Sequence, residues 1–285
     1  MPSRQGGHKL ITRMKHGSIF LLILLTSIPL AASAAKTFKV TIDPGHGGAD
    51  LGTTYNTGTT RLAEKDLALL VALETSEELR SRGHFVLLTR EKDEEVSLPA
   101  RTAMANKFNA DVFLSIHLNS ASYRSHGGET QGVETYILNT TTDASSRRLA
   151  QLENRVIAGS AAESTEQLDV ALILKDLRLD ANMPESKRLA CAVQDKLIST
   201  SPRGYNRKVR NRGVKQALFH VLLGADMPSV LVEIGFLASA NDRQILLSHK
   251  GRKAIARAIG SAIDTFKKEK ELQSNPSNIS KCKIN

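Results

Sequence analysis

Short apolar runs alternate along this chain with longer segments of helical periodicity, and this alternation restricts the fold more than any other feature. The expected strands are residues 38–42, 85–89, 112–116, 133–138 and 230–234. The expected helices are residues 64–82, 99–108, 186–198, 241–247 and 250–267. Strands that alternate with helices form sheets whose faces the helices cover. The sequence therefore predicts an α/β domain.

The first 34 residues have the parts of a secretory signal. A basic segment without acidic residues, 4–15, precedes an apolar run at 19–30 and a small-x-small sequence at 32–34. The apolar run is shorter than the roughly 20 residues of a membrane-spanning helix. We expect cleavage after residue 34 and export to the periplasm without a permanent membrane anchor. The alternative is an uncleaved N-terminal anchor.

The charge balance indicates an anionic partner. The chain has 39 basic and 29 acidic residues, and removal of the expected signal leaves 35 and 29, a net charge of +6. A basic exported protein suits a cell envelope. Nucleic acid is not expected, because aromatic residues make up only 4% of the chain and no basic stripe contains them.

One long segment interrupts the alternation. Residues 139–185 separate a strand from the next regular helix, and structureless loops of this length are uncommon in a compact domain. The segment contains helical patterns at 146–157 and 168–177. We expect a domain over residues 35–267 and a polar tail over 268–285. Cys191 lies in an apolar helical stripe and is interpreted as a core residue. Cys282 lies in the tail, and the two positions do not by themselves imply a disulfide.

Three expected strands lead into side chains that can carry chemistry. His46 follows the strand 38–42, His117 follows the strand 112–116, and Glu233 follows the apolar residues 230–232. If these strands are parallel, the three side chains emerge at the carboxyl edge of the sheet, where ligands usually bind. Two imidazoles and a carboxylate at this edge can bind a metal ion or act as acids and bases.

A catalytic zinc site needs three nitrogen or oxygen ligands and an open position for water. His46 and His117 supply two, and Glu64, at the start of the first helix, is the best candidate for the third. Asp50 and Asp66 are less well placed. Water bound to such a zinc has a pKa near ~7, and Glu233 is placed to take its proton and pass it to a leaving amine.

Each of these residues also has an ordinary interpretation. A histidine after a strand is usually structural, and an acidic residue at the start of a helix often serves the helix dipole. Glu233 also suits a solvated strand end. The glycine-rich turn at 45–48 has a rival interpretation as a phosphate cradle, although it lacks the Lys-Ser/Thr pair of a P-loop.

Longer motifs surround these residues. They are VTIDPGHGGAD (40–50), EKDLAL (64–69), VLLTREKDEEVSLPARTAMAN (86–106), ADVFLSIHLNS (110–120), GVETYIL (132–138) and MPSVLVEIGFL (227–237). In this order and spacing, the chain from residue 39 to 266 resembles the zinc-dependent N-acetylmuramoyl-L-alanine amidases of the type that includes the bacterial cell-division amidases. The resemblance implies a single α/β domain around a mixed, mostly parallel sheet with helices on both faces.

The resemblance also implies the contents of the site. One Zn²⁺ ion would be held by His46, Glu64 and His117, and Glu233 would be the essential second glutamate. Asn119 would orient His117 or contact substrate. The implied reaction is hydrolysis of the amide between N-acetylmuramic acid and L-alanine in peptidoglycan, by an enzyme that acts in cell-wall remodelling and daughter-cell separation. A monomer is the default expectation for its oligomeric state.

Arg90, Arg101 and Asn106 match residues that fix loops near the site. Two departures from the family pattern affect the fit of substrate rather than the metal ligands. Leu223 stands where a basic residue is frequent, and the turn at 238–241 is stretched.

The segment 139–185 is similar to the insert of division-type amidases, especially at 144–159 and 168–177. There, the resemblance implies a helix that covers the site until an activator protein displaces it. Glu163 or Glu166 would then place a carboxylate on the zinc ion in the position of water. The alternative is a helical hairpin on the surface with no blocking role.

Three other functions remain open. A different zinc hydrolase of the wall, a peptidase or a deacetylase, would use the same metal site. A non-catalytic peptidoglycan-binding protein would be expected to have lost a ligand or Glu233, and none is missing. A serine carboxypeptidase would use the Ser-x-x-Lys sequence at 33–36, but this sequence overlaps the expected cleavage site.

Overall fold

The computed structural model describes residues 38–120, 130–155, 176–200, 209–272 and 284. Residues Thr37–Asn285 form one compact unit, and Met1–Lys36, which holds the expected signal, lies outside the described residues. Within the described ranges, no helix is long and apolar enough to cross a membrane.

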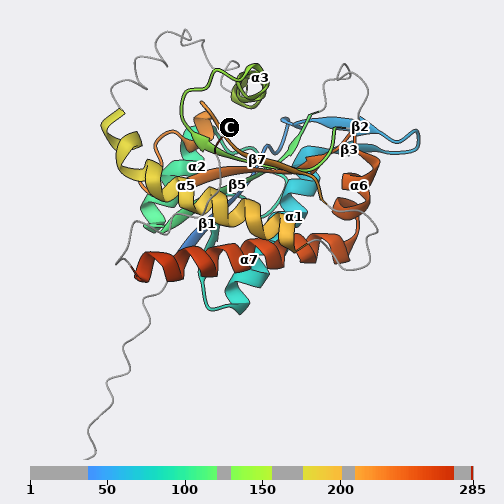
Figure 1. The fold of residues 1–285 in the computed structure, drawn as a ribbon. Coiled ribbons are helices and arrows are strands. Elements are labelled where there is room, and N and C mark those ends of the chain that lie inside the picture. The colour runs from blue at the N-terminus through green and yellow to red at the C-terminus, as the bar shows by residue number, and fades with distance from the viewer. Residues whose placement is uncertain (1–37, 121–129, 156–175, 201–208, 273–283, 285) are drawn as a thin grey trace, which may run out of the picture. The chain divides into compact units, whose positions relative to one another are not determined.

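A six-stranded mixed sheet forms the centre of the domain (Figure 1). Its strands, in spatial order, are β4 (Phe85–Leu88), β1 (Lys39–Pro44), β5 (Val112–Asn119), β8 (Ser229–Phe236), β6 (Val133–Leu138) and β7 (Asn211–Ala217). All neighbouring strands are parallel except β6 and β8, which are antiparallel. The predicted mixed, mostly parallel sheet is therefore confirmed. A separate hairpin pairs β2 (Thr54–Asn56) with β3 (Arg61–Ala63).

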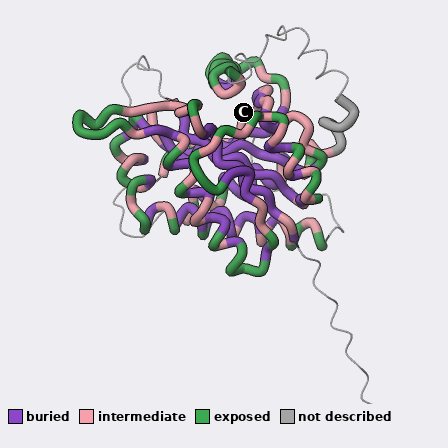
Figure 2. Tube along the Cα trace, turned by 180° about the vertical axis from the view of Figure 1, so that it is seen from behind, coloured by how far each residue is buried: buried purple, intermediate pink, exposed green. Residues whose placement is uncertain are grey.

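Helices cover both faces of the sheet. One face packs against α1 (Glu64–Ser81), α5 (Asp176–Ser199) and α7 (His249–Glu271), whose apolar residues share one core with the sheet. The other face packs against α2 (Leu98–Phe108), α3 (Ala144–Glu153) and the short 3₁₀ helix η2 (His220–Leu222). The remaining helix, α6 (Ala240–Leu247), follows β8. Figure 2 shows the resulting layer of buried strands between partly exposed helices.

The side chains of β5 point alternately to the two faces of the sheet. Val112, Leu114 and Ile116 belong to the core beneath α1, α5 and α7, whereas Phe113 belongs to the core beneath α2 and α3. Side chains alternate between faces along a strand. His117 therefore lies on the face that carries α3, and all of β5 is buried because both its faces are covered.

Two helix boundaries differ from the expectation. The helix α5 begins at Asp176 rather than at residue 186 and contains Pro184. Proline is typical of a first helical turn, which makes the residues after it resemble a helix start. In the long segment, α3 occupies Ala144–Glu153 rather than 146–157.

Cys191 is buried in the core as expected, at 2% exposure, and it is also disulfide-bonded. The sequence contains two cysteines, and Cys282 lies outside the described residues. Near the C-terminus, Ile284 forms a parallel bridge with Val214 of β7 and packs against the core.

Candidate metal centre

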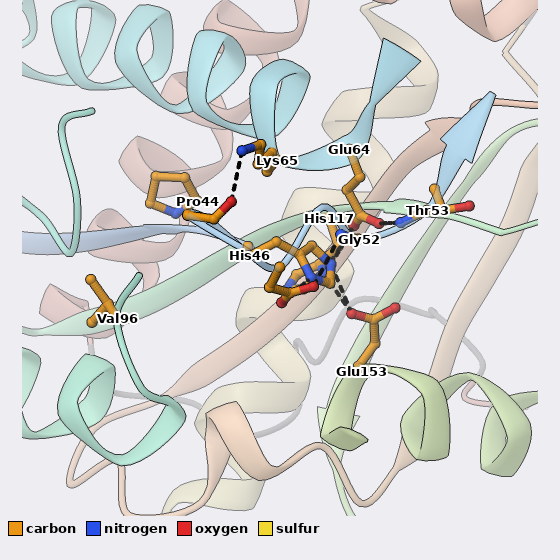
Figure 3. A network of polar contacts seen from close by, with 12 residues as sticks. Pro44, His46, Gly52, Thr53, Glu64, Lys65, Val96, His117 and Glu153 are labelled. Atoms are coloured by element: carbon orange, nitrogen blue, oxygen red, sulfur yellow. Dashed lines mark hydrogen bonds and ion pairs between the residues drawn. The ribbon is translucent and has the colours of Figure 1, made fainter. Parts of the chain in front are cut away.

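Four side chains from distant parts of the chain converge above the sheet. The potential ligand atoms of His46, Glu64, His117 and Glu153 all lie within 4.8 Å of one another. Figure 3 shows the two imidazoles and two carboxylates turned toward one centre. The structure thus brings together the three metal ligands that the sequence predicted and adds a fourth side chain, the carboxylate of Glu153.

The distances around this centre are nearly uniform. Oε1 of Glu64 lies 3.1 Å from Nε2 of His46 and 3.1 Å from Nδ1 of His117. Oε2 of Glu153 lies 3.1 Å and 3.0 Å from the same two nitrogens. Each carboxylate therefore faces both imidazoles.

The turn after β1 positions His46. This residue has a φ of 61°, and Gly47 and Gly48 follow it with φ values of 134° and 60°. Such angles suit glycine and are uncommon for other residues. The glycine-rich sequence therefore turns the chain sharply enough to bring the imidazole back over the sheet.

Two buried arginines hold this turn. Arg101 donates to the carbonyl oxygens of Pro44 and His46 and forms an ion pair with Asp43. Arg90 donates to the carbonyl oxygens of Pro44 and Gly45. These bonds satisfy carbonyl groups that the turn removes from the strand ladder, and they agree with the predicted loop-fixing role.

The third predicted loop-fixing residue, Asn106, acts at another loop. Its side chain bonds to the backbone of Gly224 and Asp226, in the segment before β8.

Glu64 is fixed by backbone amides. It begins α1 and is 1% exposed. The N–H of Leu118 donates to its Oε1 and the N–H of Thr53 to its Oε2, both at 2.8 Å. Bonds to both oxygens orient the carboxylate, so its direction toward the imidazoles does not depend on a bound ion.

Asp50 binds the outer nitrogen of His46. Its Oδ2 lies 2.7 Å from Nδ1 of that ring, and its Oδ1 accepts from the N–H of Gly52. A carboxylate on the far nitrogen of a ligand histidine fixes the ring and raises its basicity. Asp50 thus lies behind a ligand, which agrees with its lower ranking as a ligand itself.

Glu153 is the site residue that sequence reasoning missed. It ends α3, which Asp143 caps by accepting from the N–H of Ser146. The next residue, Asn154, donates to the carbonyl of Leu218 and accepts from the N–H of His220, which fixes the end of the helix above the site.

One signal for Glu153 was present in the sequence. It is the single acidic residue in the stretch 144–159 that resembles the regulatory insert. The carboxylates proposed instead, Glu163 and Glu166, lie outside the described residues.

Glu233 lies on β8 beside the cluster. It is directly opposite His117 in the β5–β8 register and is fully buried. Neither of its carboxylate oxygens has a hydrogen-bond partner among the described residues. Burial raises its pKa well above the usual value, and the nearby carboxylates of Glu153 and Glu64 raise it further. Such a group readily holds a proton.

Asn119 does not bond to His117. Its Nδ2 donates to Oε2 of Glu134, on the neighbouring part of the sheet, at 3.2 Å.

The two carboxylates of the cluster raise the pKa of both imidazoles. Burial lowers the pKa of His117, but Glu153 and Glu64 outweigh this effect and raise it to about 9. The same competition, with Glu64 the main carboxylate, raises the pKa of His46. Nε2 of His46 and Oε2 of Glu153 are buried and face each other without the alignment of a hydrogen bond. Atoms arranged in this way fit a divalent cation, and nitrogen and oxygen donors fit zinc.

A buried His/Glu ligand set near the carboxyl ends of parallel strands, beside an unpaired carboxylate, is typical of metal-dependent hydrolases. Comparison with known proteins narrows this class. Residues 40–265 match the family model described as N-acetylmuramoyl-L-alanine amidase, and the chain belongs to this family.

Relatives of this family match over most of the chain. AmiC of Neisseria meningitidis serogroup B is 31% identical over 229 residues, which are 80% of this chain and 52% of that protein. This chain thus spans about half the length of that relative. AmiA of Escherichia coli K12 is 29% identical over 244 residues, which are 84% of this chain and 80% of that protein.

Solved structures show the same fold. An N-acetylmuramoyl-L-alanine amidase from Clostridium difficile 630 superposes with a TM-score of 0.60 at 29% identity, covering 82% of this chain and 98% of that one. AmiC2 of Nostoc punctiforme superposes with a TM-score of 0.57 at 28% identity, covering 80% and 96%.

Proposed function

We propose that this protein hydrolyses the amide bond between N-acetylmuramic acid and the L-alanine of the peptidoglycan stem peptide. In this proposal His46, Glu64 and His117 hold one Zn²⁺ ion. The observation that carries the proposal is the position of Glu233, buried and unpaired, directly opposite a proposed metal ligand. Membership in the amidase family supports the choice of bond.

The residues divide the work of hydrolysis. A bound zinc ion supplies a Lewis acid for the scissile carbonyl and increases the acidity of a water molecule. Glu233 accepts the proton of the attacking water and delivers it to the leaving nitrogen, as a general base and then a general acid. Its raised pKa suits the second step, because the carboxyl group retains the proton until the amine departs. Asp50 and the amides of Thr53 and Leu118 keep the ligands in place.

We further propose that Glu153 blocks this site. Catalysis requires an open coordination position, and the Glu153 carboxylate faces both imidazoles where water or the substrate carbonyl must bind. Its charge also raises the pKa of Glu233, which opposes the ionised form that a general base needs.

The packing of α3 suits a removable cover. Only Ser146, Leu149 and Ala150 of this helix are buried, and most of its other residues are exposed. A helix with so few buried contacts detaches at low cost. An activator protein that binds α3 would therefore open the site. Glu163 and Glu166 remain the rival candidates for the blocking carboxylate.

The cellular setting is part of the proposal. The expected signal at 1–34 and the net charge of +6 suit a periplasmic enzyme that acts on the anionic wall as a monomer. Remodelling of the wall and separation of daughter cells is the role we assign to it.

Digestion of purified peptidoglycan tests the activity. The mature protein is stripped with a chelator, assayed with and without added zinc, and the products are identified by mass spectrometry. We expect free stem peptides beginning with L-alanine, only with metal, and none from Glu233→Gln. As a matched control, Glu78→Gln, at the opposite end of α1 from Glu64, retains parental activity.

Other outcomes would redirect the assignment. Cleavage of a different bond would keep the metal site but make the enzyme a peptidase or deacetylase. No cleavage by the parent and by Glu153→Ala would favour a non-catalytic peptidoglycan-binding protein.

A further inference from the structure

A row of charged side chains continues from the metal centre across the sheet. His117 of β5 is opposite Glu233 of β8, and Glu233 is opposite Glu134 of β6. Residues directly opposite in neighbouring strands lie on the same face. On the far side of Glu134, the edge strand β7 contributes Arg212 and Lys215, both in ion pairs with that carboxylate.

Glu134 is built into the sheet as an anchor for these cations. It is 2% exposed and accepts hydrogen bonds from the hydroxyl of Tyr136 at 2.5 Å and from Asn119. Nζ of Lys215 lies 3.1 Å from its Oε1. Because two cations face one carboxylate, this end of the row has a net positive charge.

Arg212 has hydrogen-bond donors that this ion pair does not use. Its Nε donates to Glu134, and its guanidinium lies over the ring of Phe236, 5.1 Å from the centroid. Its two terminal nitrogens donate to no group in the part of the chain that the structure describes. The side chain is 26% exposed, so solvent or a ligand can reach part of it. A guanidinium held by its Nε presents a fork that matches a carboxylate.

The order of these side chains across the sheet predicts in which direction the bound substrate extends. If Glu233 protonates the leaving nitrogen, the departing peptide extends from Glu233 on the side away from His117. That side is the β6–β7 part of the sheet, where Arg212 and Lys215 lie. Stem peptides carry carboxylates, at their C-terminus and on acidic residues, and these are the groups that a cationic fork binds.

We propose that Arg212, oriented by Glu134 and supported by Lys215, binds a carboxylate of the departing stem peptide and makes the enzyme prefer stems in which that group is free. This inference rests on the proposed amidase function, which supplies the position of the leaving peptide. The helix α3 shares a core with Tyr136, next to this row, so its displacement opens the peptide side of the site together with the metal centre.

Binding of a soluble stem peptide tests the inference without catalysis. Zinc-loaded protein with Glu153→Ala, which removes the blocking carboxylate, is titrated by calorimetry with the stem peptide and with the same peptide carrying amidated carboxylates. We expect the free acid to bind about tenfold more tightly, the scale of one half-exposed charge-assisted pair. Adding Arg212→Gln should remove this difference in affinity between the two peptides, and Arg212→Lys in its place should keep part of it.

A matched variant controls for the loss of an arginine. Arg82 is also 26% exposed and paired with carboxylates, Glu78 and Asp264, near the end of α1 far from the row. We expect Arg82→Gln to keep the tenfold ratio. Unchanged binding of the amidated peptide by Arg212→Gln shows that the variant is folded, whereas a variant that keeps the parental ratio would overturn the inference.

Release of stem peptides from peptidoglycan separates this inference from the proposed function. If the protein distinguishes the two peptides through Arg212 but releases no stem peptide, the carboxylate site is supported and the amidase function is contradicted. If the protein releases stem peptides but Arg212→Gln distinguishes the two peptides as the parent does, the amidase function is supported and the carboxylate site is contradicted.

Discussion

Oε2 of Glu153 lies 3.0 Å from Nδ1 of His117, although the first residue ends a lightly packed helix and the second lies in a central strand. A helix whose buried side is small is held over the site partly by this polar contact. The contact is therefore both the block and a part of its attachment, and its removal is expected to release the site.

We expect Glu153→Ala to raise basal peptidoglycan hydrolysis by about ten- to a hundredfold, because a charge-assisted contact of this kind contributes about 1.5–3 kcal/mol. Stem-peptide release by zinc-loaded protein measures the change. Glu163→Ala and Glu166→Ala are the comparison variants and should remain at the parental rate. If one of them is activated and Glu153→Ala is not, the blocking carboxylate has been assigned to the wrong residue.

The bond between Asp50 and the outer nitrogen of His46 predicts an effect on metal affinity. Asp50→Asn should weaken zinc binding by about ten- to a hundredfold, since carboxylates behind ligand histidines contribute on this scale. Competition with a chromophoric chelator measures the affinity. Asp195→Asn, at an exposed position of α5, should bind zinc as the parent does. Equal affinities for all three proteins would show that Asp50 does not support the metal site.

Gly45 tests how closely the turn must approach His117. A Cβ atom added at this residue would lie 2.4 Å from Cε1 and 2.5 Å from Nε2 of the His117 ring. The ring must then move, so Gly45→Ala should lose zinc affinity and most activity and cost about 1–3 kcal/mol of unfolding free energy. Gly58→Ala, where an added Cβ meets nothing within 4 Å, should leave zinc affinity unchanged. Normal zinc binding by Gly45→Ala would contradict so close an approach of the turn to the ring.

The sequence predicted the centre of this molecule because local and global signals agree there. The strand β5 carries apolar residues on both faces before His117, and β1 runs directly into the glycine-rich turn that carries His46. Parallel pairing of these two strands then suffices to bring the imidazoles together, and Glu64 follows from its place at the start of α1.

The parts that were not predicted depend on tertiary contacts. The strand β7, with the sequence NRGVKQA, is polar because it lies at the edge of the sheet, so it lacks the apolar run that marks a strand. Glu153 reaches the site through the docking of α3 on Leu218 and His220, which no local pattern encodes. The opposition of Glu233 and Glu134 depends on the register of two antiparallel strands far apart in sequence.

Asp43 gives the fold a dependence on acid pH. It is fully buried, pairs with Arg101 at 2.7 Å and accepts from the hydroxyls of Thr89 and Ser115. Burial alone raises its pKa, but Arg101 and the two hydroxyls outweigh burial and hold the pKa below 3.8. Its stabilising effect is therefore complete above the unfolded-state value near ~4 and is lost as the pH falls through the lower folded-state value.

Asp43→Asn should lower the unfolding free energy by about 3–5 kcal/mol at neutral pH, because it leaves a buried cation unpaired. Urea unfolding at pH 7, 5 and 3 should show this difference unchanged between pH 7 and 5 and smaller at pH 3. Asp195→Asn should differ from the parent by less than about 0.5 kcal/mol at neutral pH. A difference for Asp43→Asn that grows toward pH 3 would contradict the assigned direction of the pKa.

The disulfide of Cys191 predicts that stability and the site respond differently to reduction. Cys191 lies in α5, in the core on the face opposite His117, so loss of the bond should leave zinc affinity unchanged. Reduction should lower the unfolding free energy by about 2–4 kcal/mol, the usual contribution of a disulfide. Cys191→Ala should remove the bond and make the unfolding free energy insensitive to reductant. Thermal unfolding with and without reductant measures both effects. If reductant leaves the melting temperature of the parent unchanged, the bond contributes nothing to stability.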